Sequence, residues 1–451
     1  MKLFGTDGIR GKVNKLPMTP ENVLRTGMAI ASVLRNDHGR NMVLIGKDTR
    51  LSGYMIESAL TSGLCSKGVN VTLVGPLPTP GIAFLTRALR LDAGIVISAS
   101  HNPFEDNGIK VFSSDGYKLS DELEKEIEER VNDKNFPRRR NTGDKIGRAF
   151  RLDDATGRYI EYVKSTVPRG MDLEGLKIVV DAANGSAYRV THVLLRELGA
   201  EVISLNDKPD GININENCGS LHLKNLAQVV RETGADIGIA HDGDADRTLF
   251  TDERGNVVDG DRIMAICAVE FKKENKLQGD TVVATVMSNF GFQKFLESKG
   301  ISLIRADVGD RYVVEKMRKG GFNLGGEQSG HIVFADYNST GDGPITALQT
   351  LAIMRKKGRR LSELCRGIEL YPQVLLNVTV SEKKDINKIP AIKNAIDKVS
   401  AKLTNTGRIL VRPSGTEPKI RVMVEAEDSV IAMTSAQEIA DLIHKKLGAP
   451  A

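Results

Sequence analysis

One arrangement of strands and helices occurs three times along this chain, and it constrains the fold more than any other feature. In each copy, a short run of branched apolar residues leads through small residues into an amphipathic helix, a Lys-Gly or Leu-Gly pair and a second apolar run. The copies cover residues 43–73, 178–202 and 281–303. A strand, a crossover helix and a second strand at this spacing are typical of a βαβ unit with parallel strands. The repetition predicts three consecutive α/β domains with mixed sheets.

The last part of the chain has a different pattern, which indicates a smaller C-terminal α+β domain. Strands are expected at residues 373–380, 407–411 and 419–425, a mostly helical segment at 386–403, and a final helix at 435–447. A length of 451 residues also exceeds what one hydrophobic core usually holds. We therefore predict four domains around a central cleft, with the boundaries 1–150, 151–252, 253–368 and 369–451.

Composition and charge exclude several classes of partner. The net charge is 63 − 58 = +5, and the one dense basic run, residues 134–140, is interrupted by Asn, Phe and Pro. Without a clustered basic face or a reading motif, no nucleic-acid partner is expected. No apolar run approaches the roughly 20 residues that span a bilayer, and the first residues do not read as a signal peptide, so no membrane partner is expected either. Four cysteines without metal-site spacing favour a cytoplasmic protein. The oligomeric state stays open, with a homodimer as one option.

A serine follows the apolar run at residues 93–97, which reads as a buried strand. Ser100 is followed by His101, Asn102 and Pro103, a combination that is typical of a tight turn at a sheet edge. α/β proteins place their chemistry at such edges. A serine is a poor nucleophile unless a base, an electrophile or a metal ion assists it. His101 and Lys110 are nearby acid–base candidates.

A second loop carries three carboxylates at alternate positions. Asp242, Asp244 and Asp246 follow the apolar run at residues 237–240 and are separated by small residues. Such a loop can direct three carboxylates at one cation, and all-oxygen ligands select a hard ion such as Mg²⁺. The spacing does not match an EF-hand. The alternative is an acidic surface turn, but three like charges at one strand end call for a counter-ion.

Two further loops are consistent with binding a phosphorylated sugar. Glu327 and Ser329, in a glycine-containing loop, can face two adjacent sugar hydroxyls, although the loop could equally be an ordinary hairpin turn. In the last domain, guanidinium groups, hydroxyls and backbone amides could together bind a phosphate. These residues are Arg412, Ser414, Gly415, Thr416 and Arg421. Taken alone, they could also form a simple turn with incidental arginines.

The four loops, in this order over essentially the whole chain, resemble those of the α-D-phosphohexomutase superfamily. The opening segment at residues 5–11 and the segments at 326–331 and 339–343 are similar to the branch of that superfamily that acts on hexosamine phosphates. The resemblance implies one loop in each of four domains. It also implies an enzyme, an intramolecular phosphotransferase of the isomerase class.

The resemblance implies interconversion of glucosamine 6-phosphate and glucosamine 1-phosphate, a step that feeds UDP-N-acetylglucosamine synthesis. Ser100 would carry the phosphoryl group, and a hexosamine 1,6-bisphosphate would be the intermediate and activator. One Mg²⁺ ion per chain would be held by Ser100, Asp242, Asp244 and Asp246.

The resemblance also implies roles for the remaining candidates. Arg10 and Arg247 would lie near the transferred phosphoryl group, and Lys110, His101 or His331 would move protons. Glu327 and Ser329 would hold the sugar hydroxyls. The phosphate that is not reacting would be held by Arg412, Ser414, Gly415, Thr416 and Arg421.

Three other functions are weighed against this one. A phosphomannomutase or phosphoglucomutase of the same superfamily is the chief alternative. A metal-dependent phosphatase would use an Asp nucleophile and a path for water, and a sugar-phosphate sensor would not need Ser100.

His241, directly before the metal loop, could contact substrate or simply pack against its neighbours.

Overall fold

The computed structural model describes residues 2–34, 40–136, 140–381, 386–413 and 418–448. The chain divides into two compact units. Unit 1 consists of Met1–Met287 and Ile301–Arg366, and unit 2 consists of Ser288–Gly300 and Gly367–Ala451. The four-domain boundaries expected from the sequence stay a prediction.

The first sheet of unit 1 has seven strands in the order β1-β2-β6-β5-β3-β4-β7. Its strands are β1 Phe4–Gly5, β2 Gly8–Lys12, β3 Met42–Lys47, β4 Asn70–Pro76, β5 Ala93–Ile97, β6 Asp106–Ser113 and β7 Ala149–Arg151. β3, β4, β5 and β7 pair in parallel, whereas β6 runs antiparallel to both β5 and β2. The first βαβ unit is confirmed as β3, α2 (Gly53–Ser66) and β4.

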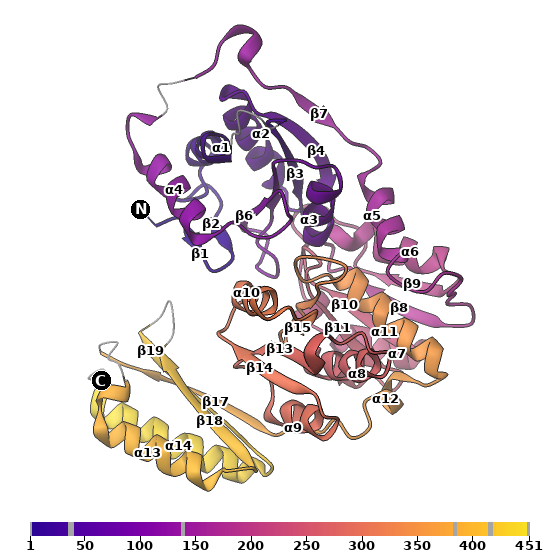
Figure 1. Ribbon diagram of the computed structural model, residues 1–451, viewed down its shortest axis with the longest axis vertical. Coiled ribbons are helices and arrows are strands. Elements are labelled where there is room, and N and C mark those ends of the chain that lie inside the picture. The colour runs from indigo at the N-terminus through magenta and orange to yellow at the C-terminus, as the bar shows by residue number, and fades with distance from the viewer. Residues whose placement is uncertain (1, 35–39, 137–139, 382–385, 414–417, 449–451) are drawn as a thin grey trace. The chain divides into compact units, whose positions relative to one another are not determined.

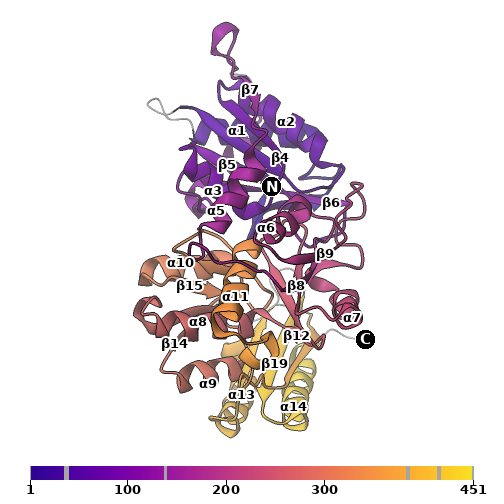
Figure 2. The same ribbon diagram turned by 90° about the vertical axis from the view of Figure 1, so that its right-hand side faces the viewer.

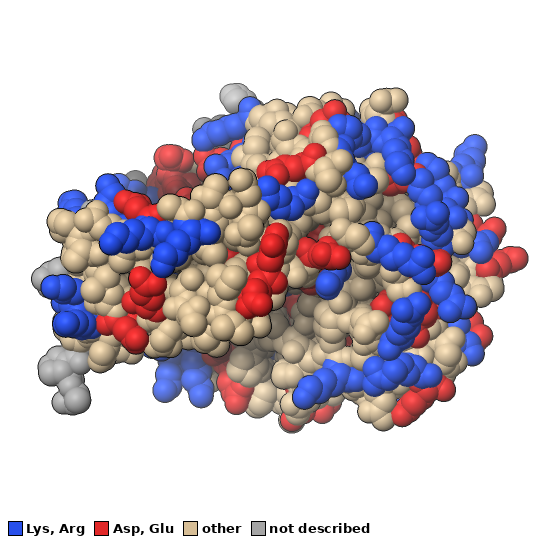
Figure 3. Space-filling model, turned by 90° about the horizontal axis from the view of Figure 1, so that it is seen from below, with Lys and Arg blue, Asp and Glu red and all other residues tan. Residues whose placement is uncertain are grey.

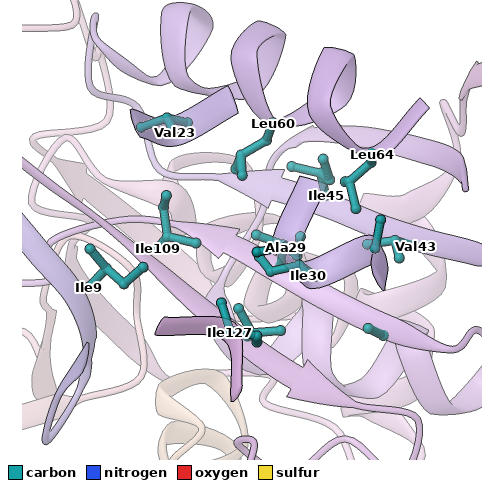
Figure 4. Packing of buried hydrophobic residues seen from close by; sticks show 14 of the residues in the cluster. Ile9, Val23, Ala29, Ile30, Val43, Ile45, Leu60, Leu64, Ile109 and Ile127 are labelled. Carbon is teal, nitrogen blue, oxygen red and sulfur yellow. The ribbon is translucent and has the colours of Figure 1, made fainter. Parts of the chain in front are cut away.

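Helices cover both faces of this sheet. On one face, α1 (Pro20–Leu34), α2 and α4 (Asp121–Asn132) pack through branched apolar side chains onto the strands, and Figure 4 shows Leu60 and Leu64 of α2 beside Ile45 and Val43 of β3. On the other face, α3 (Thr79–Ala88) lies close to the strands. It can do so because Gly46 and Gly94 carry no Cβ atom; a Cβ atom at either position would clash with Ile82 or Thr86 of α3. Burial of this apolar surface is the main stabilising contribution.

The second and third sheets of unit 1 are smaller mixed sheets, in the orders β12-β11-β10-β8-β9 and β14-β13-β15-β16. Strands of the second are β8 Lys177–Asp181, β9 Glu201–Leu205, β10 Ile237–His241, β11 Thr248–Asp252 and β12 Val257–Val258. Strands of the third are β13 Thr281–Thr285, β14 Ser302–Ala306, β15 Leu324–Gly326 and β16 Ile332–Phe334. The other two predicted parallel pairs, β8 with β9 and β13 with β14, are confirmed.

Helices accompany both of these sheets along the chain. They are α5 Ala155–Lys164, α6 Thr191–Glu197, α7 Lys224–Thr233, α8 Gly260–Lys273, α10 Asp310–Gly320, α11 Gly343–Lys357 and α12 Leu361–Leu364. A 3₁₀ turn at Ser186–Arg189 directly precedes α6. The two views show α8 and α11 side by side (Figures 1 and 2).

All three sheets contain the same four-strand arrangement. The orders β4-β3-β5-β6, β9-β8-β10-β11 and β14-β13-β15-β16 are equivalent, with three parallel strands followed by one antiparallel strand. The turn between the third and fourth strand of each arrangement carries one of the predicted functional loops. Ser100 lies between β5 and β6, Asp242 to Asp246 lie between β10 and β11, and Glu327 and Ser329 lie between β15 and β16.

Unit 2 is an α+β unit, as expected. Its antiparallel sheet has the order β17-β19-β18, with β17 Gln373–Thr379, β18 Gly407–Pro413 and β19 Lys419–Ala426. Its helices are α9 Phe290–Ser298, α13 Pro390–Lys402 and α14 Ser429–Leu447. α14 begins before the predicted residue 435 because the Asp428 carboxylate accepts hydrogen bonds from the backbone amides of Val430 and Ile431. An aspartate in this position is a strong helix cap.

Charged side chains of both signs are interspersed over the face seen in Figure 3. Among the residues that the structure describes, no helix is long and apolar enough to cross a membrane.

Candidate active site

Ser100 sits in a left-handed backbone conformation at the β5–β6 turn, with φ of 52°. A serine rarely adopts this conformation, so the surrounding contacts must impose it. Its amide donates to Ser98 Oγ at 2.9 Å, and Ser98 Oγ donates to Asp48 Oδ2 at 2.6 Å. The turn is thereby fastened to the end of β3.

The second sheet brings the acidic loop against this serine. Ser100 Oγ donates to Asp242 Oδ2 at 2.6 Å. Ser100, Asp242, Asp244 and Asp246 are all buried, and one carboxylate oxygen from each Asp lies within 4.8 Å of the other two. A surface turn would leave these carboxylates in water, so the alternative interpretation of this loop is excluded.

The carboxylates fit a hard divalent cation. Oδ1 of Asp244 and Oδ1 of Asp246 are buried and have no hydrogen-bond partner among the residues that the structure describes, although such oxygens are normally satisfied. Burial, together with the charges of Asp246 and Asp244, holds the pKa of Asp242 well above its usual range. Three converging carboxylates, two of which have an unsatisfied oxygen, match the ligands that Mg²⁺ prefers.

Lys110 connects two of the three carboxylates. Its Nζ donates to Asp244 Oδ2 at 2.8 Å and to Asp246 Oδ2 at 3.0 Å, and it lies 3.5 Å from Asp7 Oδ2. Burial alone would lower the pKa of Lys110, but Asp244 and Asp246 outweigh it and raise this pKa well above its usual value. The ammonium group therefore occupies the Oδ2 atoms and leaves the Oδ1 atoms for a cation.

His101 is a second titratable group beside the serine hydroxyl, after Asp242. Its Nδ1 lies 3.1 Å from Ser100 Oγ. Burial and the positive charges of Arg247 and Arg10 lower the pKa of His101 to about 4, so the ring is neutral at pH 7. Arg10 pairs with Asp7, and Arg247 lies 4.0 Å from Asp246. Both guanidinium groups therefore border the same acidic cluster.

The third sheet adds the loop between β15 and β16. Ser329 Oγ donates to Glu327 Oε2 at 3.4 Å, so the two side chains do face the same way, on what is also a hairpin turn. His331 Nδ1 lies 3.6 Å from Asp246 Oδ1. The Gly341 amide donates to His331 Nε2 at 3.0 Å, which favours a neutral ring, although Asp246 and Asp310 outweigh the effect of burial and raise the pKa of His331.

Two of the predicted phosphate-binding residues are described in unit 2. Arg412 of β18 and Arg421 of β19 face each other across the two strands. Burial and the charge of Arg421 lower the pKa of Arg412. Like charges directly opposite each other destabilise a sheet, and an anion bound there would offset that repulsion. Ser414, Gly415 and Thr416 lie outside the described residues.

Comparison with known proteins matches four consecutive parts of the chain to the domains of one family. Residues 1–138, 157–255, 259–371 and 375–442 match, in turn, domains I, II and III and the C-terminal domain of phosphoglucomutase/phosphomannomutase. The chain belongs to the phosphoglucomutase/phosphomannomutase family. The predicted resemblance and the predicted fold class are confirmed.

Within this family, two relatives are similar over nearly their whole length. The phosphoglucosamine mutase of Thermodesulfovibrio yellowstonii is 57% identical over 95% of this chain and 96% of its own. The phosphoglucosamine mutase of Citrifermentans bemidjiense is 56% identical over 100% of this chain and 99% of its own. A solved phosphoglucomutase/phosphomannomutase family protein from Burkholderia thailandensis has a TM-score of 0.82 at 27% identity, covering 99% of this chain and 98% of that one.

Aspergillus fumigatus N-acetylphosphoglucosamine mutase, solved with GlcNAc-6P and magnesium, shares the fold of the family. Its TM-score to this chain is 0.66 at 19% identity, covering 98% of this chain and 96% of that one.

Several residues of this family site escaped the sequence analysis. Arg50, Thr79 and Asn215 contact the serine loop or the metal loop, and Lys118 bridges Asp7 and Asp310. The sequence does contain a pattern that indicates Arg50, because Asp48, Thr49 and Arg50 are polar residues that follow a buried strand, as Ser100 does. Nothing local in the sequence distinguishes Thr79 or Asn215 from ordinary loop residues.

Proposed function

We propose that this chain is a phosphoglucosamine mutase that interconverts glucosamine 6-phosphate and glucosamine 1-phosphate through a phosphoserine at position 100. The contact that carries the chemistry is Ser100 Oγ against Asp242 at 2.6 Å, inside a cluster of three buried carboxylates. The full-length similarity to phosphoglucosamine mutases supports the choice of substrate. The reaction would feed UDP-N-acetylglucosamine synthesis.

Phosphoryl transfer at this site balances with the groups within reach. The bond between phosphorus and Ser100 Oγ breaks, a bond to the substrate hydroxyl oxygen forms, and the proton of that hydroxyl ends on Oγ. His101 Nδ1, at 3.1 Å, and Asp242 Oδ2, at 2.6 Å, are the groups near enough to handle that proton. The resulting 1,6-bisphosphate reorients within the site and then returns its other phosphoryl group to Ser100.

The metal ligands we propose for Mg²⁺ are Asp242, Asp244 and Asp246, together with an oxygen attached to Ser100. When bound, the ion supplies charge neutralisation for the transferring phosphoryl group. Lys110 holds Asp244 and Asp246 through their Oδ2 atoms, so we assign it that holding role in place of proton transfer.

The remaining residues are proposed to bind the substrate. Arg10 and Arg247 stabilise the transferring phosphoryl group. Glu327 and Ser329 form hydrogen bonds with adjacent sugar hydroxyls. The paired guanidinium groups of Arg412 and Arg421, with Ser414, Gly415 and Thr416, bind the phosphate that does not react. His331 keeps its proposed place in proton movement.

We propose a cytoplasmic location, because all four cysteines are free thiols and the substrate is a phosphorylated sugar. A homodimer, and the absence of nucleic-acid and membrane partners, stay predictions.

A coupled assay of glucosamine 6-phosphate turnover tests the proposal, with Mg²⁺ and a trace of hexose 1,6-bisphosphate. Wild type, Ser100→Ala and a control, Ser58→Ala, are compared. Among the described residues, the Ser58 hydroxyl donates only to the carbonyl oxygen of Tyr54 in its own helix. We expect turnover in wild type and Ser58→Ala and loss in Ser100→Ala. Activity only on mannose or glucose phosphates would change the substrate, and sustained phosphate release would indicate a phosphatase. Full activity of Ser100→Ala would refute the mechanism.

A further inference from the structure

Two side chains from different sheets bind the backbone of the serine loop at the same two carbonyl oxygens. Arg50 Nη2 donates to the carbonyl oxygens of Ser100 and Asn102 at 2.9 and 2.8 Å. Asn215 Nδ2 donates to the same two oxygens at 2.9 and 3.1 Å. Arg50 lies between β3 and α2 of the first sheet, and Asn215 lies between β9 and α7 of the second. The serine loop is therefore held from both sheets at once.

Arg50 is a rigid part of this arrangement. It is fully buried, its Nε donates to Asp48 Oδ2 at 2.8 Å, and it also donates to the carbonyl oxygen of Pro103. Asp48 in turn accepts from Ser98 Oγ. A planar guanidinium whose three nitrogens all donate hydrogen bonds in a buried site is held in a fixed orientation.

Asn215 is anchored to the second sheet rather than to the first. Its backbone amide donates to the carbonyl oxygen of Ala183 at 2.9 Å, and it adopts a left-handed conformation with φ of 60°. A Cβ atom on Gly243 of the metal loop would lie 2.6 Å from the Ser100 carbonyl oxygen and 2.9 Å from Asn215 Nδ2. The metal loop thus passes directly against the contact between Asn215 and the serine loop.

The position of these contacts suggests why they are needed. Ser100 is on one sheet and its partner Asp242 is on another, and Ser100 is held in a strained conformation. Phosphoryl transfer depends on placing the reacting oxygen accurately, and small displacements of that oxygen lower the rate strongly. A contact made by the second sheet to the backbone of Ser100 couples the serine directly to the sheet that carries the carboxylates.

We infer that Asn215 is a positioning residue for the reacting serine, acting with Arg50. Its amide fixes the carbonyl oxygens of Ser100 and Asn102 relative to the metal loop, so that Oγ stays directed at the carboxylates. The inference rests on the proposed mutase reaction only for its kinetic consequence. The restraint on the loop is a property of the protein without substrate.

Asn215→Gly is the variant that tests the inference, and Asn217→Gly is its matched control. Both positions are asparagines of one loop with positive φ, 60° and 52°, and glycine tolerates that conformation at either. Asn217 is exposed, and the structure describes no side-chain hydrogen bond for it. Comparing the two variants therefore separates the effect of losing the Asn215 amide donor from the general effect of placing a glycine in this loop.

Two readouts are compared: hydrogen exchange of the peptide covering residues 98–106 in the absence of substrate, and kcat and KM for glucosamine 6-phosphate. For Asn215→Gly we expect at least about tenfold faster exchange of that peptide, a fall in kcat of about tenfold to a hundredfold, and a KM within about twofold of wild type. Exchange of a peptide covering β13 serves as the reference for global stability. Asn217→Gly should match wild type in both readouts.

Three results would overturn the inference. They are unchanged exchange of the serine loop, an unchanged kcat despite faster exchange, or the same changes in Asn217→Gly. If wild type itself does not turn over glucosamine 6-phosphate, the proposed function fails, while the exchange measurement still decides whether Asn215 restrains the loop.

Discussion

Thr79 and Asp244 are joined by two hydrogen bonds, one from the side chain and one from the backbone of the threonine. Thr79 Oγ1 donates to Asp244 Oδ2 at 2.6 Å, and the Thr79 amide donates to the Asp244 carbonyl oxygen at 2.9 Å. Thr79 begins α3 of the first sheet, so this helix orients a metal ligand that belongs to the second sheet. Residues behind the metal ligands commonly tune metal affinity in this way.

Replacing Thr79 should therefore weaken metal binding. Thr79→Val keeps the shape of the side chain but removes the hydroxyl that holds Asp244 Oδ2. We expect about a tenfold loss of Mg²⁺ affinity, measured by isothermal titration calorimetry of the variant against wild type. Thr86→Val is the control, since in the described part of the chain the Thr86 hydroxyl donates only to the carbonyl oxygen of Ile82 within α3. Equal Mg²⁺ affinities for Thr79→Val and wild type would contradict this role.

A methyl group on Gly243 should separate the serine loop from the metal loop. A Cβ atom there would lie 2.6 Å from the Ser100 carbonyl oxygen and 2.8 Å from Ile214 Cδ1, distances at which the backbone must shift. We expect Gly243→Ala to fold but to lose at least about a hundredfold in kcat, because Ser100 Oγ moves away from Asp242.

The control for that substitution is Gly157→Ala, on the exposed side of α5, where a Cβ atom meets nothing within 4 Å. Alanine is the better helix former there, so its stability should rise by about 1 kcal/mol with activity unchanged. Steady-state kinetics and thermal unfolding of both variants check the pair. A Gly243→Ala enzyme with wild-type kcat would show that the two loops need not be this close.

His241 packs behind the metal loop, and we predict that it does not contact substrate. It is fully buried, its Nε2 lies 2.9 Å from Thr191 Oγ1, and its Nδ1 lies 3.3 Å from the Arg247 carbonyl oxygen. His241→Leu would leave both of these groups without their partner and should lower the free energy of unfolding by about 1–3 kcal/mol. Urea unfolding measures that loss. KM should stay at the wild-type value, and a large rise in KM would instead indicate contact with substrate.

Asp342 should make stability depend on pH in mildly acidic solution. Burial raises the pKa of this carboxyl to about 6, although it accepts hydrogen bonds from the Ile345 amide, Asn338 and Tyr159. An unfolded Asp titrates near 4, so between about pH 4 and pH 6 the folded protein keeps a proton that the unfolded chain has lost. The contribution of this proton to stability is fully present below about pH 4 and disappears as the pH rises through about 6.

Asp342→Asn isolates this effect, because asparagine cannot titrate. From pH 4 to pH 7, wild type should lose about 2–3 kcal/mol of unfolding free energy relative to Asp342→Asn. Unfolding in urea at several pH values measures it. A difference that does not vary with pH would show that folding does not raise the pKa of Asp342.

The elements of this protein could be predicted well where the pattern is local. β3, β8 and β13 are buried on both faces, so each appears in the sequence as an uninterrupted run of branched apolar residues. The starting point of α14 was missed because one aspartate, Asp428, decides it through two hydrogen bonds rather than through periodicity. The residues at the ends of β5 and β10 were identified because polar groups after a buried strand have few other reasons to be there.

The sequence by itself determined the three repeated α/β arrangements and the reactive residue types at their turns. Both depend on residues close together in the chain, namely the periodicity of each strand and helix and the polar residues that follow each strand. Only the tertiary structure decided which turns meet. Asn215 lies 115 residues from Ser100 and Thr79 lies 165 residues from Asp244, and each contact depends on the pairing of strands far apart in the chain. Hydrogen bonds are short and directional, so no pattern among neighbouring residues encodes which distant carbonyl or carboxylate a side chain will reach.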